Sequence, residues 1–430
     1  MTGVPRRMAA LRATASRGAI VVMAFTLVAN AANYLTNLAF SRLLSPVGYG
    51  ELSALLALAV VIAVPTGAAQ TVLANRVATL RTHNDTNGIR DIMRYSLGHT
   101  AAITITVGLI YAASIPLVDA ALALKQPGPA IAMIPLLVLL FIQPAELGLL
   151  QGLGRFGAFG LTLFALAASR MLFGIAWVLA GGGAAAAIGG QAVGAALVLV
   201  VCAFLTRGFV QGPGSGTARR GFTRKPTTRT VTATLTFIAF AILSNVDIVL
   251  AKVFLTPQQA GIYAAIATVG KITLFLPSAV AFVVVPAVAA ARASGGDPSR
   301  VLRRGGRMVV AIALVAVIPM LVAPQVFVRI MFGAAYASAA SGVRPIVLAG
   351  MGFALLYLLC SFVAAIADSR WFVLLVAGVG LQIGAIALIH GSPTQIAWVQ
   401  CGGVAVILAA NEVWGHPLVR RMRELSSSPG

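Results

Sequence analysis

Twelve apolar runs take up most of this sequence and restrict the chain to one kind of fold. Each run reaches the length of about 20 residues that a helix needs to cross a bilayer. Hydrophobic residues make up 59% of the chain and charged residues 10%, which is too apolar for a soluble domain of this size. We therefore predict an all-α membrane protein with twelve transmembrane helices. The runs lie near 18–44, 50–74, 95–118, 129–151, 157–181, 184–206, 231–255, 260–290, 308–332, 345–367, 371–390 and 394–416.

The basic residues give the predicted orientation of these helices. With the N-terminus placed in the cytoplasm, most of the 31 lysines and arginines fall in cytoplasmic segments, as the positive-inside rule requires. Lys125 and Arg344 are the two that fall in outer loops. We therefore predict a multi-pass protein with cytoplasmic N- and C-termini. Because membrane topology accounts for the net charge of +21, we expect no nucleic-acid partner.

A repeated turn divides the chain into two halves. Leu44-Ser45-Pro46 returns as Leu255-Thr256-Pro257, and Gly50 returns as Gly261 at the same offset. Each half contains six runs, so both halves enter the membrane in the same direction and are parallel repeats. The segment between them is rich in Gly, Pro, Thr and Arg, which is typical of a flexible linker. The predicted domains are a six-helix lobe at 1–206, the linker at 207–229, a second six-helix lobe at 230–416 and a cytoplasmic tail at 417–430.

The first predicted span carries polar side chains at helical spacing. Thr26, Asn30, Asn33, Asn37 and Ser41 are three or four residues apart, so they share one face of a helix. Unpaired amides in hydrocarbon are costly, so this face should meet protein or water. Two interpretations stay open. The face lines a cavity, or it forms hydrogen bonds between helices that hold the bundle together.

The seventh predicted span carries a looser counterpart of this stripe. Ser244 is the repeat equivalent of Asn33, and Asp247 is the only acid in the span. Lys271, on the next span, falls at a similar depth, so we expect it close enough to pair with Asp247. Ionisable residues inside a membrane are expensive and mark functional sites by default. The alternative is a structural ion pair between the two spans.

Other ionisable residues also lie in the predicted spans or at their ends. Arg170, near the middle of the fifth span, is long enough to meet Glu146 of the fourth or to point into a cavity. Lys252, near the outer end of the seventh span, either faces a cavity or extends to the interface. Arg42 lies close to Glu51 across the first turn, where a simple ion pair is the alternative to a binding role.

Prolines occur at similar places in the second and eighth spans. Pro65 with Gly67 lies inside one, and Pro277 lies inside the other. Proline removes a backbone donor and bends a helix. Bent spans at equivalent positions of two repeats indicate a binding site or a hinge. We therefore predict hinges at Pro65, Gly67 and Pro277, although prolines are common in membrane helices for other reasons.

Patterns typical of enzymes and metal sites are absent from the sequence. There is no Walker A loop, no HExxH motif and no cluster of His and Cys at metal-ligand spacing. Cys202, Cys360 and Cys401 lie separately inside apolar runs. We expect a protein that is not an enzyme and that holds no cofactor or metal.

Two motifs resemble a known group of transporters. The Asn-rich first span with its turn LLSPVGYGEL (43–52), and LTPQQAGIYAAIATVGK (255–271), resemble bacterial oligosaccharide and polysaccharide flippases. These O-antigen-flippase-like proteins belong to the multidrug/oligosaccharidyl-lipid/polysaccharide exporter superfamily. The resemblance covers spans one, two, seven and eight, and the remaining spans only by topology. It implies two six-helix lobes around a central cavity that opens alternately to each side of the bacterial cytoplasmic (inner) membrane.

The resemblance also implies a function. The expected substrate is a polyprenyl-pyrophosphate-linked oligosaccharide, moved from the inner to the outer leaflet for cell-surface polysaccharide biosynthesis. Membrane lipids, and glycosyltransferases or a polymerase of the same pathway, are the expected partners. Either H⁺ or Na⁺ would be the coupling ion, with Asp247 and Glu146 as its candidate sites. The expected substrate-binding residues are Asn30, Asn33, Asn37, Arg42, Arg170, Ser244, Lys252 and Lys271.

Two alternatives to the flippase are a multidrug extruder of the same superfamily and, from another functional class, a membrane enzyme. A multidrug extruder of the same superfamily would export organic cations against H⁺ or Na⁺, and acids should then dominate its cavity. In this sequence the basic residues inside the predicted spans outnumber the acidic ones. A membrane enzyme acting on the same lipid-linked sugars would need a large outer loop with catalytic residues, and the outer loops here are short.

Overall fold

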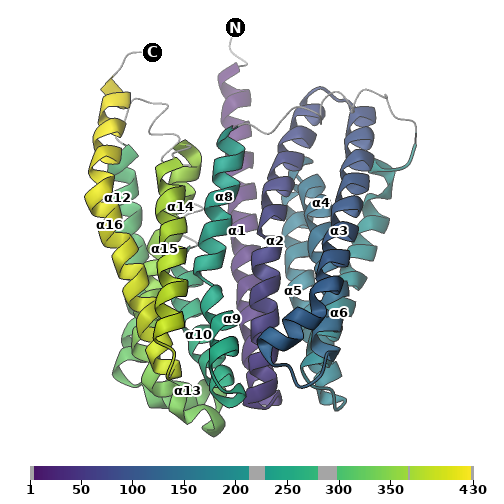
Figure 1. Ribbon diagram of the computed structural model, residues 1–430. Helices are drawn as coiled ribbons and strands as arrows, with labels where there is room; N and C mark the ends of the chain where they lie inside the picture. Colours follow the sequence, from purple (N-terminus) through teal and green to yellow (C-terminus); the bar gives the residue numbers. More distant parts are fainter. Residues whose placement is uncertain (1–3, 213–227, 279–297, 367–368, 428–430) are drawn as a thin grey trace. The chain divides into compact units, whose positions relative to one another are not determined.

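The computed structural model describes residues 4–212, 228–278, 298–366 and 369–427. Within these ranges the regular secondary structure is helical and no strand is present. The helices are α1 (Val4–Leu43), α2 (Pro46–Thr82), α3 (Thr86–Leu122), α4 (Gly128–Gly152), α5 (Phe156–Leu179), α6 (Ala184–Thr206), η1 (Arg207–Phe209), α8 (Thr228–Leu243), α9 (Val246–Phe254), α10 (Pro257–Ser278), α12 (Pro298–Val322), α13 (Pro324–Phe332), η2 (Ala334–Ala339), α14 (Ala340–Ile366), α15 (Ser369–Leu388) and α16 (Pro393–Ser427), of which η1 and η2 are 3₁₀ helices (Figure 1).

The described helices confirm a multi-pass membrane protein. Ten segments in the described ranges are long and apolar enough to cross a membrane, and they coincide with ten of the predicted spans. The other two predicted spans, 260–290 and 308–332, correspond to α10 and to α12 with α13. The first of these continues past Ser278 into residues outside the described ranges. The total of twelve helices and the cytoplasmic termini stay predictions.

Local sequence explains where several helices begin. A proline at the first helical position has no N–H that would otherwise lack a partner, and its φ angle suits a helix. Helices α2, α10, α12, α13 and α16 begin at such prolines: Pro46, Pro257, Pro298, Pro324 and Pro393. The repeated Leu-Ser/Thr-Pro turn therefore starts an apolar helix in both halves of the chain.

The helices group into two compact units. The first unit comprises Met1–Ala39, Pro65–Val118 and Gln126–Lys225, and the second comprises Phe40–Val64, Asp119–Lys125 and Pro226–Gly430. The last residues of α1 and the first half of α2 therefore belong to the second unit. The division within α2 falls at Pro65, one of the predicted hinges. The predicted domain boundaries at 206 and 230 stay a prediction, and linker residues 213–227 lie outside the described ranges.

Small residues allow close helix packing in the first unit. Helices α5 and α6 lie side by side (Figure 1), with Gly190 and Gly194 of α6 against the backbone of α5. A buried apolar cluster that includes Val77, Met93 and Leu149 joins α2, α3 and α4. Close approach at small residues is typical of membrane helices, because lipid supplies no hydrophobic force between them.

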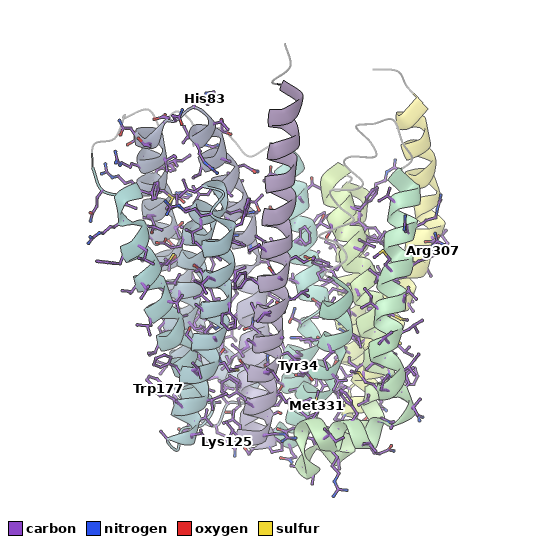
Figure 2. All side chains as sticks on the ribbon, turned by 180° about the vertical axis from the view of Figure 1, so that it is seen from behind. Tyr34, His83, Lys125, Trp177, Arg307 and Met331 are labelled. Carbon is purple, nitrogen blue, oxygen red and sulfur yellow. The ribbon has the colours of Figure 1, made fainter. Side chains whose placement is uncertain are left out.

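Two helices of the first unit can be seen to run in opposite directions. Figure 2 shows His83, in the loop after α2, and Trp177, near the end of α5, at opposite ends of the unit. Helices α2 and α5 therefore run in opposite directions, as the alternation of the predicted spans requires.

In the second unit, α14 packs against both α10 and α16 (Figure 1).

The two repeat-related turns also meet in the second unit. A Cβ atom on Gly50 would lie 2.9 Å from the backbone nitrogen of Gly261, and a Cβ atom on Gly261 would clash with the carbonyl of Pro46. The hydroxyls of Tyr49 and Thr268 form a hydrogen bond of 2.8 Å beside this contact.

The seventh predicted span coincides with Thr230–Phe254, but its helix is interrupted at one point. Helix α8 ends at Leu243 and α9 begins at Val246, so Ser244 and Asn245 interrupt the helix. No proline causes this break. Ser and Asn side chains compete for backbone hydrogen bonds, which favours interruption of a helix at such residues.

The α5–α6 contact provides a test of the packing. Gly194→Ala would place a Cβ atom 2.5 Å from the carbonyl oxygen of Ser169, and overpacking of this kind costs about 1–3 kcal/mol. Gly108→Ala in α3 is the control, because no atom lies within 4 Å of the added Cβ. Thermal unfolding of the purified proteins in detergent should show a lower melting temperature for Gly194→Ala alone. Equal melting temperatures for the two variants would contradict the packing.

Candidate functional site

The interruption between α8 and α9 leaves backbone carbonyls that the helix itself does not pair. The amide of Asn245 donates from Nδ2 to the carbonyl of Ala241 at 2.9 Å, and Ser244 bonds back to its own helix through its hydroxyl. The carbonyl of Leu243 accepts a hydrogen bond of 3.4 Å from Nε2 of Gln400. In hydrocarbon each of these groups needs a partner. Polar side chains are therefore required at this depth.

Two ionisable side chains lie beside the interruption. Lys271 of α10 donates from Nζ to Oδ1 of Asn245 at 3.1 Å. Asp247, in the first turn of α9, accepts a hydrogen bond of 2.6 Å from the hydroxyl of Tyr263 at Oδ2. A negative charge is favourable in the first turn of a helix. The charges of Asp247 and Lys271 interact, but the expected direct pair is not formed, because Lys271 bonds to Asn245 instead.

Two buried glutamines extend this network to α15 and α16. Gln382 of α15 donates from Nε2 to Oε1 of Gln400 of α16, and the two side chains are 1% and 2% exposed. A buried amide without partners would be destabilising. The chain of bonds from Gln382 through Gln400 to Leu243 thus connects α15 and α16 to the end of α8.

A small cavity of about 20 Å³ adjoins the interruption. Its polar lining consists of Ser244, Asp247, Lys271 and Gln400. Oδ1 of Asp247 is buried and has no hydrogen-bond partner among the described residues. We call the interruption, this cavity and the side chains around it the broken-helix site. It holds one carboxylate, one ammonium group and several neutral donors and acceptors.

Lys252 lies in the last turn of α9. Its side chain is only 3% exposed, so in this structure it does not extend to the interface. Within the described residues its Nζ atom has no hydrogen-bond partner, although it interacts electrostatically with Glu51. Oε1 of Glu51 accepts a hydrogen bond of 3.2 Å from the backbone N–H of Lys125.

Arg42 holds the first turn against α13. Its Nε donates to the carbonyl of Met331 at 2.9 Å, and a second guanidinium nitrogen donates to Ile330. These carbonyls belong to the last turn of α13, where a positive charge is favourable. The expected pair with Glu51 is therefore replaced by a contact with α13. Figure 2 shows Lys125 and Met331 at the same end of the second unit.

Arg170 and Glu146 of the first unit have different hydrogen-bond partners. Arg170 of α5 donates from Nη2 to Oε1 of Gln191 of α6 at 3.2 Å, and its buried Nε has no acceptor among the described residues. Glu146 of α4 accepts a hydrogen bond of 3.0 Å from the hydroxyl of Thr206. Of the two alternatives for Arg170, a contact with Glu146 is not formed, because each side chain bonds to another residue.

The predicted asparagine stripe belongs to a continuous helix, α1. Asn30 and Asn37 are half-buried and Asn33 is exposed. Asn37 donates to the carbonyl of Asn33 at 2.9 Å, one turn back in the same helix. Part of the stripe is thus paired within its own helix, and its role in binding stays a prediction.

Helix α2 continues through the predicted hinge residues Pro65 and Gly67. The third, Pro277, lies next to Ser278, the last described residue of α10, and the residues that follow lie outside the described ranges. Pro65 does border a second cavity, of about 110 Å³, between α2, α3 and α4. Its polar lining is neutral and consists of Thr66, Gln70, Ser96 and Thr100. A hinge role stays a prediction.

The structure brings Ser244, Asp247 and Lys271 together, and adds four residues that the sequence analysis did not select. They are Asn245, Tyr263, Gln382 and Gln400. A usable signal is the pair Ser244-Asn245, which ends two residues before the intramembrane acid Asp247. The isolated glutamines of the last two spans formed no stripe, so only their tertiary contacts reveal them.

Comparison with known proteins supports a transporter fold. No family model and no curated protein matches the sequence. The structure is similar to the inward-facing conformation of a multidrug resistance MATE family transporter of the MOP superfamily, with a TM-score of 0.71 and 15% identity, over 95% of this chain and 100% of that one. The outward-facing conformation of a MATE family transporter gives a TM-score of 0.59 at 13% identity, over 95% and 96%.

A third similar structure differs in the chemistry of its pocket. It is a MOP superfamily transporter from Pyrococcus furiosus, for which reverse polarity of the binding pocket suggests a different function. Its TM-score is 0.61 and its identity 16%, over 95% of this chain and 96% of that one. Identities this low show the fold and leave the substrate open. This chain has the fold of the MATE transporters of the MOP superfamily.

Proposed function

We propose that this protein is a flippase for a polyprenyl-pyrophosphate-linked oligosaccharide. It moves this lipid from the inner to the outer leaflet of the bacterial cytoplasmic membrane for cell-surface polysaccharide biosynthesis, by alternating access of its two lobes. The observation that carries the proposal is a set of basic side chains with unused N–H donors. Nε of Arg170 and Nζ of Lys252 have no acceptor among the described residues, and Lys271 has one acceptor for three N–H groups.

Donors of this kind match the chemistry of a pyrophosphate. Phosphate oxygens accept short, charge-assisted hydrogen bonds from guanidinium and ammonium groups. In a site with little water these interactions are much stronger than in bulk solvent. The buried, unsatisfied donors of Arg170 and Lys252 would therefore favour a conformational state in which an anionic lipid headgroup reaches them.

The neutral polar groups suit the sugar. Hydroxyl groups both donate and accept hydrogen bonds, and so do the amides of Asn30, Asn33 and Asn37. These amides carry no charge, and Asn37 bonds to the carbonyl of Asn33 one turn back in α1. Uncharged side chains of this kind would let the protein hold an oligosaccharide without binding it too tightly to release.

The multidrug exporter is the second candidate. It is favoured by the similarity to MATE transporters and by the buried acids Asp247 and Glu146. The two buried basic groups without acceptors argue against it, because they would repel an organic cation. A strain that lacks the gene should keep its resistance to cationic drugs if the flippase proposal holds, whereas a multidrug exporter requires new sensitivity.

Neutralising the three intramembrane cations tests the proposed substrate. The triple variant Arg170→Gln, Lys252→Met, Lys271→Met should reduce surface polysaccharide at least tenfold, because each charged hydrogen bond contributes about 1.5–3 kcal/mol. The control removes the exposed charges of Arg304, Arg307 and Arg329 instead, and should retain most of the polysaccharide. Normal polysaccharide in the first variant, at equal protein levels in the membrane, would refute the cation role.

The two buried acids can be tested as coupling groups by comparison with each other. Proteoliposomes would be loaded with a fluorescent lipid-linked sugar and assayed with and without an ion gradient. We expect Asp247→Asn to abolish the stimulation by the gradient, because the amide keeps an acceptor for Tyr263 and loses the charge. Glu146→Gln should retain it, because that carboxylate is held by the hydroxyl of Thr206 away from other charges. Equal stimulation of Asp247→Asn and the wild type would exclude Asp247.

A further inference from the structure

We propose that the ammonium group of Lys271 is a built-in cation of the broken-helix site, which supplies the charge that a bound sodium ion would otherwise supply. The inference rests on the proposed transport role of the broken-helix site and concerns which ions that site binds. The wild-type site binds no Na⁺. Removal of the lysine charge should create a sodium site from the groups that remain.

Interrupted membrane helices commonly bind cations through the carbonyls at the end of the first half-helix. In this protein those carbonyls already have donors. Ser244 and Asn245 bond to the last turn of α8, and Gln400 reaches the carbonyl of Leu243. The side-chain oxygen Oδ1 of Asn245 faces Lys271 at 3.1 Å. An ammonium nitrogen thus lies against a side-chain oxygen of the interruption, while the backbone carbonyls bond to neutral donors.

The charge balance of the site gives the same result. When ionised, Asp247 contributes one negative charge and Lys271 one positive charge, whereas Ser244, Asn245 and Gln400 are neutral. The site is therefore neutral without any ion. A sodium ion would add an unbalanced charge to a buried site, and an uncompensated buried charge is strongly unfavourable.

The cavity shows what would follow if Lys271 lost its charge. About 20 Å³ is open beside Asp247, enough for one water molecule or a dehydrated monovalent cation. Oδ1 of Asp247 is buried and has no hydrogen-bond partner among the described residues, and Ser244 and Gln400 also line this cavity. With methionine at 271 the site would be a carboxylate with neutral oxygens around it, which suits Na⁺.

Sodium binding to the purified full-length protein tests the inference. Melting temperatures would be measured in NaCl and in choline chloride at equal concentration, together with binding of radioactive ²²Na⁺. We expect no sodium-specific effect for the wild type. For Lys271→Met we expect a rise of several degrees in sodium and saturable binding of about one ion per chain, because a ligand that binds the folded state stabilises it.

Three control variants make the result specific. Lys271→Arg keeps the charge and should bind no Na⁺. Lys252→Met removes another buried lysine of the second unit and should also bind none. The double variant Lys271→Met, Asp247→Asn should lose the sodium binding gained by Lys271→Met alone.

Two results would overturn the inference. One is sodium binding to the wild type that disappears in Asp247→Asn. The other is a folded Lys271→Met protein, monodisperse and with a cooperative melting transition, that binds no Na⁺. The measurement involves no transported substrate, so it stands or falls separately from the flippase proposal. A different substrate would leave the sodium result unchanged.

Discussion

A backbone carbonyl inside a membrane must have a hydrogen-bond donor, and the second unit is organised around this requirement. The gap between α8 and α9 leaves carbonyls that the helix does not pair. Asn245 and Gln400 supply donors, and they in turn need Lys271 and Gln382 as partners. The ammonium group of Lys271 is balanced by the nearby carboxylate of Asp247. One two-residue interruption thus explains why polar side chains from α10, α15 and α16 are buried at one place.

The two halves of the chain differ at this point although their turns are alike. By the repeat offset, Asn33 corresponds to Ser244, Thr36 to Asp247 and Val60 to Lys271. Helix α1 is continuous through Asn33, and Thr36 bonds to a carbonyl of its own helix at 2.7 Å. The first half therefore has neither the interruption nor the charged pair. The broken-helix site is therefore a property of the second half.

The membrane spans could be predicted from the sequence because hydropathy is a local property. Asp247 and Lys271 could be selected because an ionisable residue in an apolar run is conspicuous. The position of the break between α8 and α9 could not be predicted in the same way, because proline is the usual sequence signal for a break and none lies there. Helix α2 remains helical through Pro65. The break occurs instead at Ser244 and Asn245, in the first span of the second half.

Long-range contacts were beyond sequence reasoning. Arg42 is almost 290 residues from its acceptors in α13, and no local pattern connects them. Glu51, its nearest acid in the sequence, instead accepts a bond from the backbone of Lys125. Gln382 and Gln400 likewise meet only because α15 and α16 pack together. Such partners depend on how the helices are arranged, which spacing along one helix does not encode.

The most direct test of the proposed function is the leaflet distribution of lipid-linked oligosaccharides in cells that lack this gene. The lipids would be extracted, identified and probed with an impermeant reagent that modifies sugars on the outer leaflet only. The flippase proposal predicts that they accumulate in the inner leaflet while the surface glycan is lost. A normal amount of lipid-linked sugar in the outer leaflet, with intact surface glycan, would contradict it.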